Sequence, residues 1–160
     1  MIDGYPEFLA IAGAVGAGLN AGVFYAFSTF VMQALGRLPS KGAVEAMQAI
    51  NIEAPRPGFM VAFMGTAVVS VILAISVLGR LDESQGVYQL VGSGLYLTGV
   101  VITGTFHVPR NNALAKLDPA SDAAVKAWST YLRTWTRGNH VRMFTSLAAS
   151  LVLILSLLVT

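Results

Sequence analysis

Residues 59–78 read FMVAFMGTAVVSVILAISVL, a stretch without a single charged side chain. A helix needs about 20 apolar residues to cross the hydrocarbon core of a bilayer. Three further segments pass the same test, at residues 8–35, 87–108 and 143–160. Because a backbone in lipid must satisfy its own hydrogen bonds, all four segments are predicted to be helices. The predicted fold class is all-α, an integral membrane four-helix bundle that forms one transmembrane domain over residues 1–160.

The composition supports this prediction. The chain is 55% hydrophobic and 11% charged, whereas soluble domains carry about 25% charged residues. The apolar segments do not alternate with period two, which argues against a membrane barrel. The sequence contains no cysteine, so disulfide and thiolate chemistry are excluded. We attribute the net charge of +2 to membrane topology, and no nucleic-acid partner is expected.

The basic residues are distributed unevenly between the two sides of the predicted bundle. Four spans place both termini and the loop at residues 79–86 on one side, where Arg80 is the basic residue. The connections on the other side carry all the rest: Arg37, Lys41, Arg56, Arg110, Lys116, Lys126, Arg133, Arg137 and Arg142. Cytoplasmic loops are enriched in Lys and Arg. We therefore expect a multi-pass protein of the cell (inner) membrane, with both long connections cytoplasmic and both termini outside.

Two stretches half a chain apart resemble each other. Residues 34–47 read ALGRLPSKGAVEAM, and residues 113–128 read ALAKLDPASDAAVKAW. One interpretation is duplication of a unit made of a span, a cytoplasmic amphipathic helix and a second span, with a pseudo-twofold along the membrane normal. The other is chance similarity in alanine-rich sequence. The first interpretation adds two cytoplasmic amphipathic helices to the bundle.

The second amphipathic helix is predicted to begin at Asp118, a good N-cap. Val125, Trp128, Leu132 and Trp135 then share one helix face, because they are spaced by three and four residues. Tryptophans on such a face either lie at headgroup depth in the membrane interface or line a pocket.

Polar residues gather where the third span ends and the fourth begins. The two histidines of the chain, His107 and His140, occupy these two positions. Further polar residues are expected on the same side: Gln48, Asn51, Arg110, Asn111, Asn112, Asn139 and Arg142. Ionisable groups at membrane depth usually face the protein interior or a wet cavity. Pro109 is predicted to end the third helix, and the nearby asparagines would then cap its free carbonyls.

Three interpretations of the histidines remain open. Each can be a structural side chain with its hydrogen bonds satisfied at the interface. A buried neutral imidazole beside Arg142 can instead act as a general base. As the third interpretation, His107 and His140 ligate a metal or a haem. In the first span, Gly18 and Gly22 form a GxxxG motif that indicates close helix packing and is compatible with a homo-oligomer.

Three ordered motifs carry a resemblance to a known family. They are EAMQAIN at residues 45–51, VPRNNALA at residues 108–115, and a Trp–Tyr–Trp pattern followed by NHVR at residues 139–142. Over residues 8–158 the chain resembles the anthrone-oxygenase-like family of small four-span membrane proteins. The following residues fall on signature positions of that family: Pro109, Asn111, Trp128, Trp135, Asn139, His140 and Arg142.

The sequence departs from the family pattern at two places. His107 stands where an asparagine is more usual, and Gly138 stands where an aromatic residue often precedes the Asn-His pair. A glycine at residue 138 is expected to widen the pocket or to loosen the start of the fourth span.

The resemblance implies a chemistry. Some fungal members of the family oxidise an anthrone to an anthraquinone with molecular oxygen, which needs no cofactor. On this basis His140 is the expected base, and Arg142 with Asn139 or Asn111 is expected to stabilise the enolate oxygen. The expected substrate-binding residues are His107, Asn112, Trp128, Tyr131, Trp135, Gln48 and Asn51. The expected partner is a lipophilic small molecule that arrives from the bilayer or the cytoplasmic face.

Two other functions fit the same residues. One is a redox membrane protein that holds haem or a metal on His107 and His140. The other is a non-enzymatic bundle that binds a lipophile or assists transport.

Overall fold

The computed structural model describes residues 5–159, and every regular element in that range is helical. In chain order the elements are α1 (Tyr5–Ala26), η1 (Phe27–Val31), α2 (Met32–Gly36), α3 (Ser40–Glu53), α4 (Pro57–Ser76), α5 (Ser84–Ile102), η2 (Thr103–His107), α6 (Val108–Ala115) and α7 (Asp122–Leu155). The π-helical turns η1 and η2 lie inside continuous helices. The all-α prediction is confirmed. Thr160, the last residue of the predicted fourth span, lies outside the described range.

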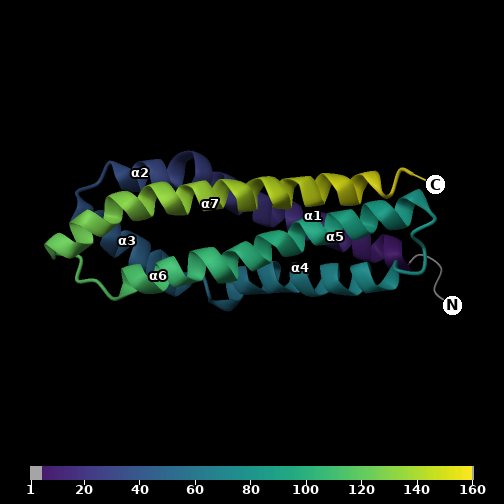
Figure 1. The fold of residues 1–160 in the computed structure, drawn as a ribbon, viewed down its shortest axis with the longest axis horizontal. Coiled ribbons are helices and arrows are strands. Elements are labelled where there is room, and N and C mark those ends of the chain that lie inside the picture. Colours follow the sequence, from purple (N-terminus) through teal and green to yellow (C-terminus); the bar gives the residue numbers. More distant parts are fainter. Residues whose placement is uncertain (1–4, 160) are drawn as a thin grey trace.

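Four helices are long and apolar enough to cross a membrane: Tyr5–Gly36, Pro57–Ser76, Ser84–Ala115 and Asp122–Leu155. They run along the long axis of the molecule (Figure 1). The start of α1, the end of α7 and the α4–α5 connection lie at one end of the bundle. At the opposite end, α2, α3, α6 and the first half of α7 continue the bundle. The four-span architecture of a multi-pass membrane protein is confirmed.

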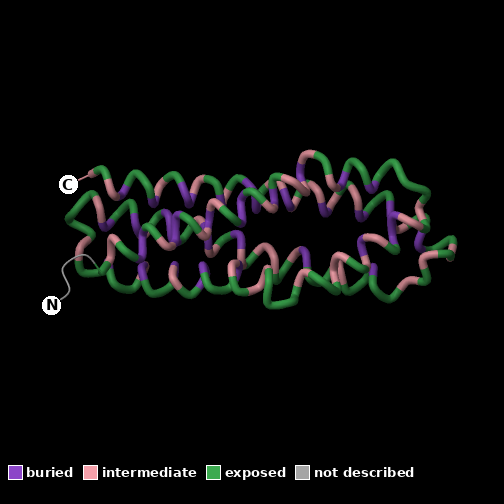
Figure 2. Tube along the Cα trace, turned by 180° about the vertical axis from the view of Figure 1, so that it is seen from behind, coloured by how far each residue is buried: buried purple, intermediate pink, exposed green. Residues whose placement is uncertain are grey.

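The surface and the interior of the bundle use different side chains. Large apolar residues are exposed on the outside of the long helices, as expected for a surface in lipid; examples are Phe8, Val15, Leu19, Val61, Val68, Ile75, Val91, Phe144 and Leu151. Figure 2 shows the exposed residues along the outer side of the helices. Inside, a Cβ atom on Gly92 of α5 would lie 2.7 Å from the Cγ atom of Leu153 in α7. Glycine therefore permits this close approach of α5 and α7.

The two predicted amphipathic helices are not built alike. The first is a separate element, α3, which ends before Pro55 and Pro57. Proline lacks an N–H and disfavours a helical residue before it, so this pair separates α3 from α4. The second is not separate: α7 begins at Asp122 and runs unbroken through the predicted start of the fourth span at residue 143. The separate second amphipathic helix is therefore a wrong prediction, because no proline interrupts this region.

Pro109 does not end the third span, contrary to the prediction. The helix passes through η2 and continues as α6 to Ala115. Pro109 lies in the first turn of α6, directly after the π-turn, where the missing N–H is best tolerated. The backbone carbonyls therefore remain within a continuous helix, and the predicted capping role of the asparagines is wrong as well.

Trp128, Tyr131 and Trp135 of α7 are buried. They pack in a cluster with residues of α2 and α3, which include Met32 and Met47. Their burial argues against a tryptophan face that lies in the membrane interface, whereas their depth in a membrane stays a prediction. Their helix face is covered by the elements that extend the bundle beyond its apolar half.

Candidate functional site

A cavity of about 560 Å³ lies inside the bundle, near the junction of α3 and α4. Its walls come from α1 and η1, α3, α4, η2 and α6, and α7. Most of the lining is apolar and includes the aromatic residues Phe24, Phe27, Phe59, Phe63 and Trp135. Polar side chains reach the same space: Asn51, Thr103, His107, Asn111, Asn139 and Arg142. We call this space the central cavity.

Arg142 is the buried cation of the central cavity, with 6% of its surface exposed. One Nη donates to Oδ1 of Asn139 at 2.7 Å, and the other donates to Oγ1 of Thr103 at 3.2 Å. The guanidinium carbon lies 4.4 Å from the ring centre of Phe24 and 5.2 Å from that of Trp135. Its Nε has no hydrogen-bond partner among the described residues.

No carboxylate of the described residues forms an ion pair with Arg142; the ion pairs there join Lys41 to Glu45, Arg56 to Glu53 and Arg80 to Glu83. Glu53 lines the cavity but pairs with Arg56 at 3.1 Å. A buried charge without a counter-charge is costly. The central cavity therefore favours a ligand that presents a negatively charged oxygen to Arg142.

Asn139 fixes the position of Arg142. Its Nδ2 donates to the carbonyl oxygen of Phe24 at 2.7 Å and to Oγ of Ser28 at 2.8 Å. Its Oδ1 accepts from Arg142, so both ends of the amide are occupied. Asn139 thereby connects α7 to α1 and η1 and holds the guanidinium against the cavity wall.

His107 is fully buried, with 1% of its surface exposed. Its Nε2 lies 3.3 Å from the carbonyl oxygen of Trp135, and its Nδ1 has no partner among the described residues. A carbonyl oxygen only accepts, so this geometry assigns the proton to Nε2 and the lone pair to Nδ1. The ring also packs edge-on against Trp135 at 5.1 Å. In the neutral ring, Nε2 thus donates to the Trp135 carbonyl, and Nδ1 is the nitrogen that has no partner within residues 5–159.

Asn111 connects α6 to α7. Its Oδ1 accepts from the hydroxyl of Tyr131 at 2.8 Å and from Nε1 of Trp135 at 3.0 Å. Trp128 stacks on Tyr131 behind this contact, with ring centres 5.7 Å apart. Trp135 and Asn111 line the central cavity, whereas Tyr131 and Trp128 support them from the buried cluster.

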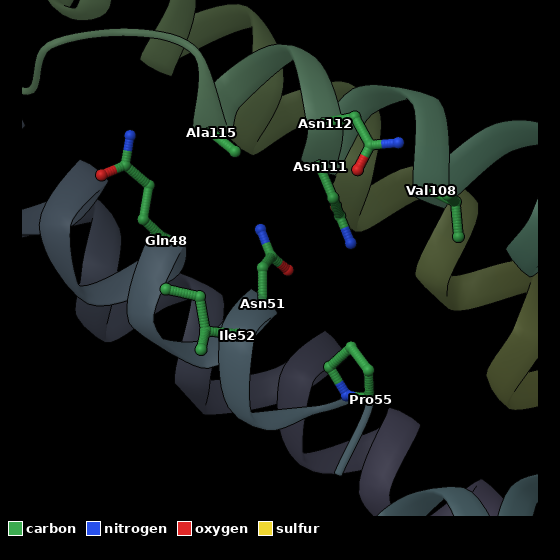
Figure 3. Close-up of a pocket in the computed structure, with 8 residues that line it drawn as sticks. All are labelled: Gln48, Asn51, Ile52, Pro55, Val108, Asn111, Asn112 and Ala115. Carbon is green, nitrogen blue, oxygen red and sulfur yellow. The ribbon is translucent and has the colours of Figure 1, made fainter.

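A second cavity, of about 370 Å³, lies between α3 and α6. It shares Asn51, Pro55, Val108 and Asn111 with the lining of the central cavity, so we call it the α3–α6 mouth. Figure 3 shows the side chains of Asn51 and Asn111 pointing into the gap between the two helices. Asn112 also lines this mouth.

Gln48 closes the outer end of the α3–α6 mouth. Its Nε2 donates to the carbonyl oxygens of Leu114 at 2.9 Å and of Leu117 at 3.0 Å. These bonds tie α3 to the end of α6. Gln48, Asn51 and Asn112, which the sequence analysis grouped as substrate-binding residues, therefore lie together at the mouth.

His140 lies apart from the central cavity. It lines a third cavity between α2 and α7. A Cβ atom on Gly138 would lie 3.0 Å from Cε1 of His107. Residue 140 is about 200° farther around the helix, because successive residues are separated by about 100°. The two histidines thus face opposite sides of α7, and a metal or haem ligated by both does not fit this arrangement.

No group of three or more His, Cys, Asp or Glu side chains that could hold a metal occurs among residues 5–159. The polar residues of the central cavity are amides, a hydroxyl, an imidazole, a guanidinium and the single carboxylate of Glu53, which pairs with Arg56. Guanidinium and amide N–H groups are suited to an anionic oxygen rather than to a cation.

Gly138 does not widen the central cavity or loosen a helix start. It lies in the interior of α7, and a Cβ atom there would lie 2.5 Å from Cε1 of Phe106. The space left by the missing side chain is filled by Phe106 and His107 of η2. Both expectations for this glycine are wrong, because η2 packs directly on α7.

Several cavity residues were missed by sequence reasoning. Phe24 and Phe27 of the first span, and Phe59 and Phe63 of the second, line the central cavity. Their spacings of three and four residues place each pair on one helix face. This spacing was a usable signal, but in an apolar span it does not separate a cavity from lipid. Thr103 was missed as well, although its Oγ1 accepts a hydrogen bond from Arg142.

The sequence profile described as anthrone oxygenase matches residues 59–152. The matched region contains α4 to most of α7 and includes His107, Asn111, Asn139 and Arg142. No curated protein and no solved structure matches the chain.

Proposed function

Because the chain belongs to the anthrone oxygenase family, we propose that it oxidises a flat, lipophilic, anthrone-like ketone with molecular oxygen in the central cavity. The observation that carries this proposal is Arg142, a buried guanidinium at the wall of an aromatic cavity that pairs with no carboxylate of residues 5–159. An enolate oxygen supplies the missing negative charge. A neutral lipophile gains this charge only after it loses a proton, so Arg142 stabilises the reacting form over the resting form.

The size and lining of the cavity support a ring-shaped substrate. Small-molecule sites commonly enclose about 300–1,000 Å³, and the central cavity measures about 560 Å³. Phe59 and Phe63 stack with ring centres 5.6 Å apart, and Phe24 meets Phe63 edge-on at 6.3 Å. Such aromatic walls favour flat rings.

The proposed reaction needs no external reductant. A base removes one proton from the methylene carbon opposite the carbonyl, and the electron pair moves onto the carbonyl oxygen as an enolate. The enolate gives its electrons to O₂, and a C–O bond forms at the former methylene carbon. Protonation yields a hydroperoxide. Loss of the second hydrogen as a proton then breaks the O–O bond, forms the new carbonyl and releases water.

We place the base at Nδ1 of His107. Within residues 5–159 this buried nitrogen has no hydrogen-bond partner, and the bond from Nε2 to the Trp135 carbonyl leaves its lone pair unshared. Arg142 stabilises the enolate, and Asn139 positions Arg142. Members of the family more often carry an asparagine at the position of residue 107. The proposed base is therefore specific to this chain and is not expected throughout the family. His140, the base expected from the resemblance, lines a different cavity and is the alternative that the experiment tests.

The experiment measures oxygen uptake and anthraquinone formation with purified protein and an unsubstituted anthrone, after subtraction of autoxidation without protein. The Arg142→Gln variant should lower kcat by about 100-fold or more. His107→Asn should lower it strongly as well, because asparagine can donate to the Trp135 carbonyl but has no basic nitrogen. His140→Ala should retain turnover.

The outcomes separate the alternatives. Turnover that survives in His107→Asn and disappears in His140→Ala would assign the base to His140. Anthrone binding without oxygen uptake by the wild-type protein would contradict the oxidation and support a lipophile-binding bundle. A thermal unfolding measurement on each variant shows whether a lost activity reflects a lost fold.

A further inference from the structure

The third cavity, of about 510 Å³, has a strongly basic lining. It lies between α2 and α7, and its cationic or imidazole side chains are Arg37, Arg133, Arg137 and His140. Among the described residues that line it, none is acidic. We call it the arginine cavity.

The three arginines of this cavity are free to bind a ligand. Within residues 5–159 none of them takes part in an ion pair or donates a side-chain hydrogen bond to the protein; the ion-paired basic residues there are Lys41, Arg56 and Arg80. Arg133, Arg137 and His140 share one face of α7, because they are spaced by four and three residues. Arg37 follows the end of α2 and approaches from the other wall.

The cavity lies at the level where the outer surface changes from apolar to charged. On α7, the exposed side chains from Val141 and Phe144 onward are apolar, whereas Arg133 and Arg137 precede them. The first long helix shows the same change, since exposed Phe30 comes before Arg37. A cationic cavity at such a boundary lies where lipid headgroups lie.

We propose that the arginine cavity binds the phosphate headgroup of an anionic phospholipid. Guanidinium groups bind phosphate oxygens through paired N–H donors, and basic pockets between membrane helices bind anionic headgroups. Arg37 holds the phosphate from α2, and Arg133 and Arg137 hold it from α7. The acyl chains lie along the apolar outer surface that begins at Phe30 and Val141. This site is independent of the proposed oxidation, and it gives His140 a binding role.

The test measures binding of fluorescent phosphatidylglycerol and phosphatidylcholine to the full chain in a zwitterionic detergent. The variant Arg37→Gln/Arg133→Gln/Arg137→Gln removes the cavity charge. A matched control, Lys41→Gln/Lys116→Gln/Lys126→Gln, removes the same charge from exposed residues at the same end of the bundle. Each arginine should contribute about fivefold to phosphatidylglycerol binding. The arginine variant should therefore bind about 100-fold more weakly, and the control should change by less than threefold.

Three results would overturn the proposal. The first is an equal loss in both variants, which would mean general charge attraction. The second is equal affinity for phosphatidylglycerol and phosphatidylcholine. The third is displacement of the lipid by millimolar inorganic phosphate, which would mean a soluble anion site. If the triple variant unfolds, the single Arg37→Gln variant replaces it, because Arg37 lies outside the long helices. This variant should weaken phosphatidylglycerol binding about fivefold.

Discussion

Asn139 and Arg142 behave as one unit in the bundle. The amide of Asn139 accepts from Arg142 with its oxygen while its nitrogen donates to Phe24 and Ser28. In the part of the chain that the structure describes, no carboxylate pairs with Arg142, so its direction depends on this amide and on Thr103. The neutral groups orient this buried cation without neutralising it, so a negatively charged ligand can pair with it. A carboxylate in the same place would neutralise the cavity.

The Asn139→Ala variant should lose about 3 kcal/mol of unfolding free energy. Three side-chain hydrogen bonds disappear, so the Phe24 carbonyl loses its side-chain donor and an Arg142 N–H is left unpaired in the interior. Ser28→Ala is the matched control, because it removes one of these bonds and should cost about 1 kcal/mol. Reversible unfolding in mixed micelles measures both values. Equal losses in the two variants would show that the Arg142 contact adds nothing.

The close packing of η2 on α7 is also set by a single residue. Gly138→Ala places a Cβ atom 2.5 Å from Cε1 of Phe106, and such overpacking should cost about 1–3 kcal/mol. Gly94 of α5 has no atom within 4 Å of its Cβ position, so Gly94→Ala should instead stabilise the helix by up to about 1 kcal/mol. The same unfolding assay compares the two. A gain of stability in both variants would contradict the tight contact.

The sequence identified several cavity residues but could not assign the histidines. Polar groups at membrane depth predict an interior site, and Asn111, Asn139 and Arg142 indeed line the central cavity. Whether His140 joins them depends on its angular position around α7, whereas His107 belongs to η2, which packs on α7 at Gly138. The angular position of a residue on α7 can be read only once the helix is known to be continuous. In the continuous α7, Trp135, Asn139 and Arg142 share a face and His140 does not.

At the scale of helices, hydropathy located the four spans but not their ends. It reports where side chains become polar, whereas a helix ends where its backbone bonds end. Two long helices therefore continue well past the predicted boundaries at residues 108 and 143, one to Ala115 and the other back to Asp122. Pro55 and Pro57 do stop a helix, but Pro109 does not, because a π-turn precedes it. Sequence patterns give little warning of such a π-turn.

The contact between α3 and α6 depends on Gln48. In a Gln48→Ala variant the carbonyls of Leu114 and Leu117 lose their side-chain donor. Hydrogen exchange of residues 113–121 should then become at least several-fold faster, because the end of α6 is no longer tied to α3. Asn112→Ala, which removes a mouth residue with no side-chain hydrogen bond within residues 5–159, should leave exchange unchanged. Unchanged exchange in the Gln48 variant would contradict this closing role.

At the scale of the whole molecule, the two halves follow one plan. In each half a long helix contains a π-turn, at η1 in the first and at η2 in the second. A helix pair separated by prolines follows in the first half, and the unbroken α7 follows in the second. This shared plan favours duplication of one unit over chance similarity. The central cavity lies between the halves, and only the second half supplies its histidine and arginine.

The length of the helices determines where this cavity lies relative to a bilayer. Asp122–Leu155 has 34 residues, which corresponds to about 50 Å of helix, whereas the hydrocarbon core is about 30 Å thick. The bundle therefore extends beyond the membrane at the end that contains α2, α3 and α6 (Figure 1). The central cavity and its mouth belong to this end.

The orientation of this end can be tested cleanly, because the natural sequence has no cysteine. Nine of the ten Lys and Arg residues belong to the connections at the extended end, which predicts a cytoplasmic location. In Lys126→Cys, a membrane-impermeant maleimide should label the protein only after the cells are permeabilised. In Asp82→Cys, which changes the exposed α4–α5 loop, the same reagent should label intact cells. The reverse pattern would place the α3–α6 mouth outside the cell, and a substrate would then have to arrive from that side.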